Sequence, residues 1–263
     1  MCGIAGYSLR PDARGARTLA AQALLAGIAE RGADAVGYAF RGAGPEVSIT
    51  KLRGGASVLL DEIALPEDAR QALIHVRDYT KGHPDVHANN HPIRHGSVVG
   101  IHNGVVTNDD ELLARYGVER HEAGMSVDSE AIFALMELRR HDPRALAELR
   151  GTMAAAWIDE REPDVLHLAR GRNRPLWVGR SSDGLFFAST RRALRIVEAV
   201  LRTPVRASEL REGRYLRVVD GEVVRERRFR PDRRYREEEP VSPVRAPHEA
   251  VSCLARLAAL TSL

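Results

Sequence analysis

The sequence predicts an α+β fold built on antiparallel sheets. Short segments rich in aliphatic and β-branched residues are joined by short turns, which is typical of strands that pair with their chain neighbours. Segments with apolar residues at helical spacing lie apart from them and are expected to cover the outer faces of the sheets. The expected strands are residues 4–8, 36–40, 47–52, 72–76, 98–102, 153–159, 165–169, 176–179 and 185–188. The expected helices are residues 16–30, 109–116, 128–138, 144–149 and 191–201.

Local signals support individual elements. The expected strand at 98–102 is almost wholly apolar, as befits a buried strand. Polar residues stand at the start of the expected helix at 128–138, and apolar residues follow at helical spacing. Near the end of the strand-rich half, Asp220-Gly221 is a two-residue turn signal, so residues 215–224 are expected to form a hairpin.

Length and composition predict one large domain with a tail. The chain has 263 residues, of which 44% are hydrophobic, and this is enough for one substantial core. We expect a domain over residues 1–230. Residues 231–263 are expected to form a charged, proline-containing linker and a short amphipathic helix. That helix has apolar residues about one turn apart, at Val251, Leu254, Leu257 and Leu260.

Several classes of function are disfavoured. No apolar run reaches the roughly 18 residues of a membrane span, and the start lacks a signal peptide pattern, so a cytoplasmic protein without a membrane contact is expected. The net charge is +3, and the densest basic stretch, residues 225–236, contains acidic residues and runs into three glutamates. Mixed signs favour a solvated tail over a nucleic-acid surface.

The cysteines and histidines do not predict a metal site or another cofactor. Cys2 and Cys253 stand at opposite ends of the chain, which indicates neither a disulfide framework nor a zinc cluster. Four histidines recur every four residues, as on one face of a helix. Two prolines interrupt this stretch and argue against a continuous helix. The residues concerned are His83, His87, His91 and His95, with Pro84 and Pro92.

Cys2 is the strongest candidate for a nucleophile. Removal of Met1 would leave a thiol and a free α-amino group on the same residue. An α-amine has a reference pKa of about 7.7–8.0, so near neutral pH it can accept the proton of the thiol without a separate histidine base. One residue would then supply both the nucleophile and the base.

Several ordered segments connect Cys2 with a known family. The first group comprises residues 31–37, 75–82, 98–106 and 126–130. A second group comprises residues 151–159, 166–170, 175–179, 186–189 and 210–214. In order and approximate spacing, these segments resemble the class II glutamine amidotransferases, which are N-terminal nucleophile hydrolases. The resemblance runs from Cys2 to about Phe229 and implies a four-layer α/β/β/α sandwich of two antiparallel sheets.

The resemblance also implies an activity and a set of site residues. The expected reaction is hydrolysis of the side-chain amide of L-glutamine through a Cys2 thioester, with ammonia passed to a separate synthase partner. An oxyanion hole would need hydrogen-bond donors near the developing negative charge, and substrate recognition would need groups for a zwitterion. The expected catalytic residues are Cys2, Asn103 and Gly104, the substrate-binding residues are Arg77, Thr80 and Asp128, and the supporting residues are Arg31 and His102.

Each of these residues also has an ordinary structural interpretation. Asn103-Gly104 is a strong hairpin-turn signal. Asp128 suits the N-cap or first turn of the following helix. Arg77 alone would be a surface charge at a strand end.

Two features differ from the usual family pattern. Asp78-Tyr79 stands where relatives often have an aromatic and a small residue, and Lys81 stands where some have histidine. The polar Asp78 puts the usual ammonia-channel contact in doubt.

Other readings of the whole chain stay open at this stage. An N-terminal nucleophile hydrolase that acts on another amide is one alternative, and a non-catalytic regulatory protein on the same fold is another. The C-terminal helix is expected to dock on a separate synthase; the alternatives are that it packs on its own domain or is a fraying remnant of a lost fusion.

Overall fold

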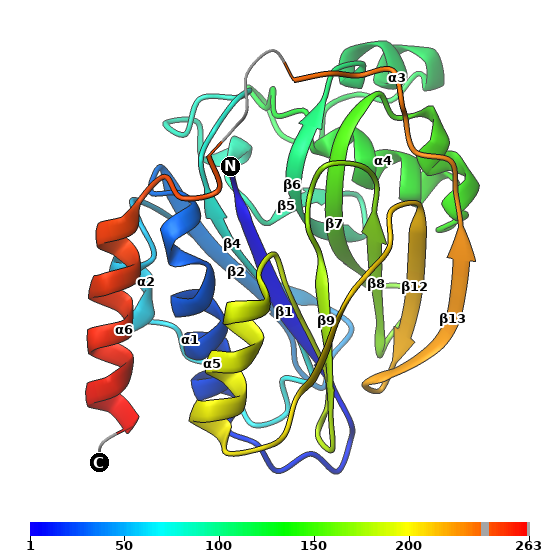
Figure 1. Cartoon of the computed structure of the whole chain (residues 1–263). Coiled ribbons are helices and arrows are strands. Elements are labelled where there is room, and N and C mark those ends of the chain that lie inside the picture. Colours follow the sequence, from blue (N-terminus) through cyan, green and yellow to red (C-terminus); the bar gives the residue numbers. More distant parts are fainter. Residues whose placement is uncertain (238–241, 262–263) are drawn as a thin grey trace.

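Two antiparallel sheets and two sets of helices make up the molecule (Figure 1). The computed structural model describes residues 1–237 and 242–261. The first sheet has the strand order β11 (Arg206–Glu209), β9 (Trp177–Ser181), β10 (Gly184–Ala188), β1 (Gly3–Leu9), β4 (Gln71–Arg77), β2 (Ala35–Arg41) and β3 (Val47–Arg53). The second has the order β13 (Glu222–Arg228), β12 (Arg214–Val219), β8 (Val165–Arg170), β7 (Gly151–Asp159), β6 (Val98–Val106) and β5 (Ile93–His95). The predicted α+β class with antiparallel sheets is confirmed.

Helices cover the outer face of each sheet (Figure 1). On the first sheet lie α1 (Arg17–Ile28) and α5 (Arg191–Leu201), and α6 (Pro247–Thr261) packs against α1 with the short α2 (Ser57–Leu60) beside them. On the second sheet lies α4 (Glu130–Leu138), and α3 (Asp109–Tyr116) packs against α4. Single 3₁₀ turns complete the fold: η1 (Ala29–Arg31), η2 (His87–Asn89) and η3 (Pro143–Glu148). No helix among the described residues is both long and apolar enough to cross a membrane.

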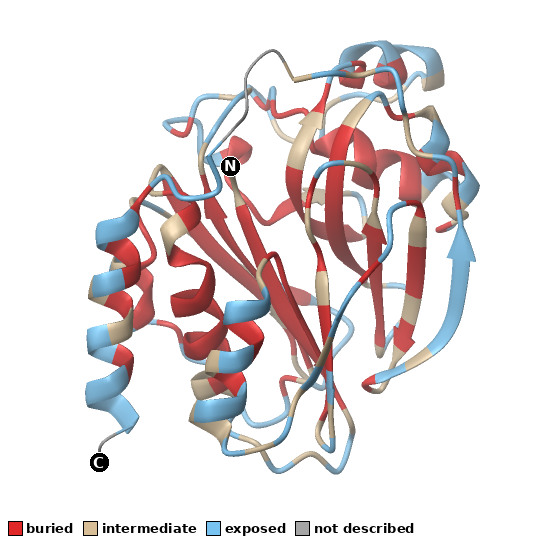
Figure 2. Ribbon diagram, viewed as in Figure 1, coloured by how far each residue is buried: buried red, intermediate tan, exposed pale blue. Residues whose placement is uncertain are grey.

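Three apolar clusters separate the four layers. Strand side chains alternate between faces, so neighbours in one strand enter different clusters. In β10, Phe186 packs under the helices of the first sheet, and Phe187 packs between the two sheets. In β7, Trp157 faces α4, and Ile158 faces the first sheet. The interior is therefore continuous across both sheets (Figure 2).

Most predicted elements are present, with a few corrections. The helix expected at 144–149 is the 3₁₀ segment η3, which begins with Pro143 and in which the Asp142 carboxylate accepts the N–H of Arg144. The strand expected to end at residue 102 continues through Val106. The hairpin at Asp220-Gly221 forms as expected between β12 and β13. The four regularly spaced histidines lie in a turn, in η2, in the segment after it and in β5.

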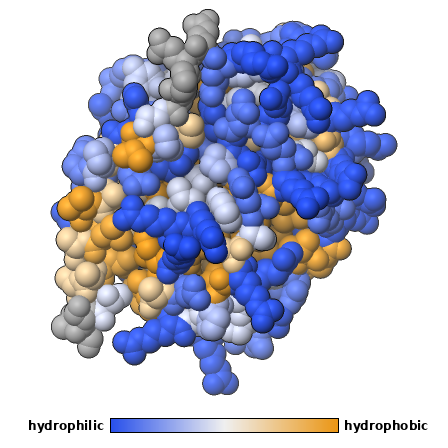
Figure 3. Space-filling model, in the orientation of Figure 1, coloured by the Kyte–Doolittle hydropathy of each residue, from blue (hydrophilic) through white to orange (hydrophobic). Residues whose placement is uncertain are grey.

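The C-terminal segment returns to its own domain. The N–H groups of Arg245 and Ala246 donate to the carbonyl of Glu30, and Cys253 and Leu257 of α6 are buried against α1. The alternative in which this helix packs on its own domain is observed, and docking on a synthase stays a prediction. Its outer face leaves Val251 71% exposed, and apolar side chains reach the surface on the side that α6 forms (Figure 3). Part of the predicted linker, residues 238–241, lies outside the described residues.

Leu257 and Val251 provide a matched test of this packing. Because Leu257 is 3% exposed, Leu257→Ala should lower the free energy of unfolding by about 2–4 kcal/mol. Val251→Ala, on the exposed face, should change it by about 0.5 kcal/mol or less. Urea denaturation of both variants measures the difference, and equal small effects would contradict the docked position of α6.

Candidate active site

Cys2 lies directly before β1 and against the residue that follows β4. The Cys2 thiol donates to the Asp78 carbonyl over 3.3 Å, and the Asp78 N–H approaches the sulfur at 3.5 Å. This position follows from the register of the ladder, in which Gly3 pairs with Val76. Burial raises the pKa of the Cys2 thiol, while the Asp78 N–H, the amino terminus and the Arg77 guanidinium act in the opposite direction.

Arg31 holds the chain on the other side of the nucleophile. Its buried guanidinium donates from Nε to the Cys2 carbonyl over 2.8 Å. The next residue, Gly32, packs closely on the end of β4, since a Cβ there would lie 2.3 Å from the Arg77 carbonyl oxygen. Arg31 therefore has the location expected of a residue that supports Cys2.

Arg77 ends β4 and is buried. Its guanidinium donates to the Asn90 side chain and to the carbonyls of Lys81 and Gly82. It thereby braces the loop that carries Thr80, whose side chain is exposed. The Nε–H of Arg77 has no acceptor within the described part of the chain.

Asn103 is the most unusual polar residue in the second sheet. Its side chain is completely buried, and neither atom of its amide group has a hydrogen-bond partner among the described residues. An unpaired buried polar group costs about 1–3 kcal/mol, so such groups call for an explanation. A group that develops negative charge beside the amide would satisfy its N–H donors.

Gly104 continues β6, so the alternative of a hairpin turn at Asn103-Gly104 is wrong. Gly104 pairs with Met153 of β7. Its φ of 152° is a conformation that favours glycine, and a Cβ there would lie 2.1 Å from the Thr152 carbonyl oxygen. The neighbouring strand thus requires glycine at this position.

A histidine bridge joins the two sheets next to Asn103. His75 Nε2 lies 3.1 Å from the His102 carbonyl, and since a carbonyl can only accept, this nitrogen carries the proton. The bridge places the end of β4, with Arg77, close to the strand that carries Asn103. His102 itself contacts the Thr152 carbonyl at 3.3 Å and the Ser129 hydroxyl at 2.9 Å. Burial lowers its pKa to about 3, which suits a structural role.

Asp128 is buried between α4 and β6. Its carboxylate accepts the N–H of Val106 over 2.7 Å, two residues after Gly104. The N-cap position of α4 is occupied by Ser129, so the expectation of an Asp128 N-cap or first-turn role is wrong. Burial, with a smaller contribution from Asp109, raises the pKa of Asp128 to about 6.

Sequence reasoning missed several partners in this region. The Asp78 carboxylate binds the amino group of Met1 and also contacts Arg245 Nε at 3.3 Å. His91 stacks on His75 with ring centroids 4.1 Å apart. Asp78 was recognisable as a departure from the family pattern, but Arg245 is 167 residues away in the chain and carries no local signal.

Lys81, the other departure, pairs with two carboxylates of α3. Its Nζ lies 2.6 Å from Asp109 and 2.8 Å from Asp110. These ion pairs anchor the far end of the loop that Arg77 braces. The loop that carries Thr80 is consequently held from both sides.

Comparison with known proteins identifies the family. Residues 66–196 match the family model of the glutamine amidotransferase domain, a range that includes Arg77, Asn103 and Asp128. Over 200 residues the chain is 28% identical to the glutamine–fructose-6-phosphate aminotransferase (isomerizing) of Clostridium acetobutylicum, with 72% of this chain and 31% of that protein covered. The chain contains a class II glutamine amidotransferase domain.

Further relatives of this glutamine amidotransferase domain support the same family assignment. The aminotransferase of the same name from Symbiobacterium thermophilum is 32% identical over 200 residues, again covering 72% of this chain and 31% of the relative. A glutamine phosphoribosylpyrophosphate amidotransferase from B. subtilis shares the fold, with a TM-score of 0.67 and 20% identity over 86% of this chain and 49% of that one. The chain spans about a third of the length of the curated relatives it matches.

Proposed function

We propose that this chain hydrolyses the side-chain amide of L-glutamine to give glutamate and ammonia. The observation that carries the proposal is the buried side-chain amide of Asn103, which has no hydrogen-bond partner within residues 1–237 and 242–261. It lies on the strand that packs against β1 and β4, the strands that position Cys2 and Arg77. A nucleophile and an oxyanion donor are parts that amide hydrolysis requires, and an arginine can bind the carboxylate of the substrate.

The proposed reaction begins with the removal of Met1. The freed amine of Cys2 takes the thiol proton, and the sulfur attacks the amide carbon of glutamine. The negative charge that forms on the oxygen is stabilised by the Asn103 side-chain N–H and the Gly104 backbone N–H. The amine then passes its proton to the leaving nitrogen, which departs as ammonia. Water hydrolyses the resulting thioester to glutamate.

Three residues are proposed to recognise the amino acid end of glutamine. Arg77 and Thr80 would bind the α-carboxylate through N–H and O–H donors. Asp128 would bind the α-ammonium group. Its burial supports this role, because a carboxylate removed from water interacts more strongly with a cation than an exposed one does.

We further propose that the ammonia is consumed by a synthase outside this chain. The synthase would be a separate subunit. In this proposal residues 1–230 form the amidotransferase domain and residues 231–263 form a tail. The contact of Arg245 with Asp78 supports a tail that remains close to the nucleophile.

Cys2 and Asn103 test the chemistry. Cys2→Ala should abolish glutamate release, and Asn103→Ala should lower kcat by about 10²–10³ with a smaller change in KM. Coupled assays of glutamate and ammonia measure both, with intact mass reporting whether Met1 is removed. Full activity of Cys2→Ala, or of protein that retains Met1, would exclude the proposed nucleophile. A wild-type chain that lacks glutaminase activity but cleaves another amide would redirect the proposal to that substrate.

Asp128 predicts a pH dependence of substrate binding. Its carboxyl group is charged above a pH of about 6 and becomes neutral below it, so KM for glutamine should rise as the pH falls through this value. Asp128→Asn retains an acceptor for the Val106 N–H but has no charge. We expect it to raise KM by about 10–100-fold at pH 7.5 and to remove the rise near pH 6.

Steady-state kinetics between pH 5 and 8 test this expectation. Asp12→Asn, a change at an exposed carboxylate, serves as the control and should follow the wild type. An Asp128→Asn variant with the wild-type KM at every pH would remove Asp128 from substrate recognition.

The external synthase is tested with glutamine labelled by ¹⁵N in its amide group. Extract from cells lacking this gene, supplemented with the purified chain, should form a ¹⁵N-labelled product. The same concentration of free ¹⁵N-ammonium should give less of it, because ammonia passed directly does not mix with bulk solvent. Equal labelling from the Cys2→Ala variant would contradict the proposed transfer.

A further inference from the structure

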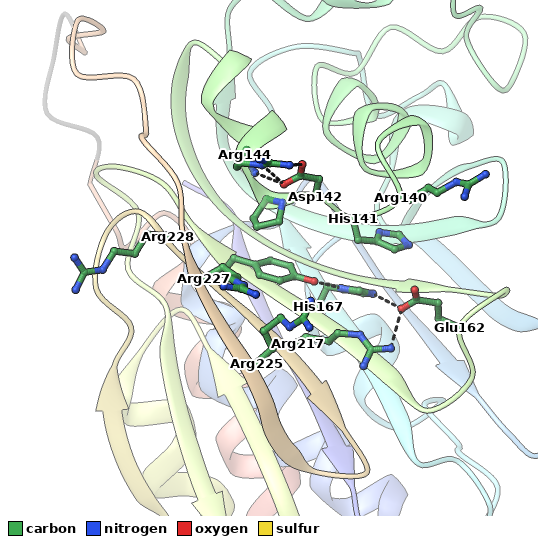
Figure 4. A pocket seen from close by; sticks show the side chains of 12 residues that line it. Arg140, His141, Asp142, Arg144, Glu162, His167, Arg217, Arg225, Arg227 and Arg228 are labelled. Atoms are coloured by element: carbon green, nitrogen blue, oxygen red, sulfur yellow. Dashed lines mark hydrogen bonds and ion pairs between the residues drawn. The ribbon is translucent and has the colours of Figure 1, made fainter.

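A second site lies on the outer face of the second sheet, away from Cys2. A cavity of about 720 Å³ opens between β8, β12, β13 and the segment 140–144 (Figure 4). None of the residues proposed above for glutamine hydrolysis lines it. The edge strand β13 is largely exposed here (Figure 2), and hydrophilic side chains dominate this side of the surface (Figure 3).

Strand register places like charges directly opposite each other in this cavity. Arg217 of β12 pairs with Arg225 of β13 on one side and with His167 of β8 on the other. In the neighbouring row, Tyr215 pairs with Arg227. Like charges in directly opposed positions destabilise a sheet. An anion in front of these strands would convert that repulsion into attraction.

The cavity has more cations than its own carboxylates can pair. Six arginines line it, against the two acids Asp142 and Glu162. Asp142 is engaged by Arg144 at 2.7 Å, and Glu162 contacts Arg217 at 3.3 Å. In residues 1–237 and 242–261, no ion-pair partner is found for the remaining four arginines, which are Arg140, Arg225, Arg227 and Arg228.

His167 forms a fixed polar point in the wall of the cavity. It is completely buried, and its ring stacks against both Trp157 and His141. Its Nδ1 contacts the Tyr215 hydroxyl at 2.7 Å, but its Nε2 has no hydrogen-bond partner in the described structure. Glu162 lies 3.6 Å from that nitrogen. The Glu162 contact is longer than a hydrogen bond, so this buried ring nitrogen can still bond to a ligand atom, and that is an indication independent of the arginines.

A metal ion is a poorer fit than an anion. His141, Glu162 and His167 have ligand atoms within 4.8 Å of one another. However, the Trp157 N–H can only donate, so it occupies the lone pair of His141 Nδ1 at 3.1 Å. His141 Nε2 then carries the proton and donates to Asp159 at 2.7 Å. Neither nitrogen of His141 has a lone pair for a metal, and the arginines would repel a cation.

We propose that this cavity binds a small molecule that carries two or more phosphate groups. Arginine matches phosphate because its planar guanidinium donates two parallel hydrogen bonds. More than one phosphate is expected because Arg217 and Arg225 lie on the sheet side of the cavity, and Arg140 and Arg144 lie on the loop side (Figure 4). The volume is within the range of small-molecule pockets, about 300–1,000 Å³.

Tripolyphosphate provides a direct probe of this site. Isothermal titration calorimetry at a fixed 150 mM NaCl should detect its binding to the wild-type chain. Arg225→Glu with Arg227→Glu should weaken binding at least tenfold. A control with the same change in charge, Arg195→Glu with Arg206→Glu, replaces exposed arginines that do not line the cavity and should change binding less than twofold.

The outcomes separate the proposal from its alternatives. No binding by the wild type, or equal weakening in both double variants, would overturn it. Binding of hexaglutamate in preference to tripolyphosphate would also overturn it and would mark a surface for acidic peptides. Without ligand, the double variant Arg225→Glu with Arg227→Glu should unfold at a urea concentration no lower than the wild type, because its change at Arg225 replaces an Arg–Arg pair by an Arg–Glu pair. This readout shows that lost binding does not result from misfolding.

Discussion

The pairing of β1 with β4 is the constraint on which the candidate active site depends. It sets Gly3 opposite Val76, and so brings Cys2 to the residues that follow β4. Close packing requires glycine at two positions here: a Cβ at Gly3 would lie 3.0 Å from Arg31 Cδ, and a Cβ at Gly32 would lie 2.3 Å from the Arg77 carbonyl oxygen. Both central strands are buried on both faces, so the position of the chain start is determined by the interior of the protein.

The second sheet contributes Asn103 to the candidate active site, and a hydrogen bond between the two sheets lies next to this residue. His75 donates to the His102 carbonyl, and the side-chain amide of the adjacent Asn103 is buried with no hydrogen-bond partner in the part of the chain that the structure describes. A protein that only needed a stable core would be better served by an apolar side chain there, since an unsatisfied amide is costly. The packing of the surrounding sheet offsets this unfavourable free energy. Unpaired buried polar groups of this kind are typical of sites where stability is exchanged for function.

Sequence predicted the elements with strong local signals and missed those set by distant contacts. The bounds of α3 and α5 were predicted to the residue, because charged and apolar residues alternate there at helical spacing. Asn103-Gly104 is a residue pair typical of a hairpin turn, and only its pairing with β7 shows that it continues a strand. Asp128 preceded an apolar helix and so resembled a cap, but its partner is the N–H of Val106 in another element. The candidate site residues came from ordered motifs, whereas Asn90, His75 and Arg245 became visible through contacts that span the fold.

Asp78 links the nucleophile to the last part of the chain. Its carboxylate binds the amino group of Met1, and its backbone N–H and carbonyl contact the Cys2 thiol. Arg245 contacts the same carboxylate at 3.3 Å, so a cation from the C-terminal segment lies beside the start of the chain. Arg245 is itself placed by the backbone bonds of residues 245 and 246 to Glu30 and by the burial of α6 against α1. The charges around the start of the chain therefore depend on the docking of α6, a helix that begins only at Pro247.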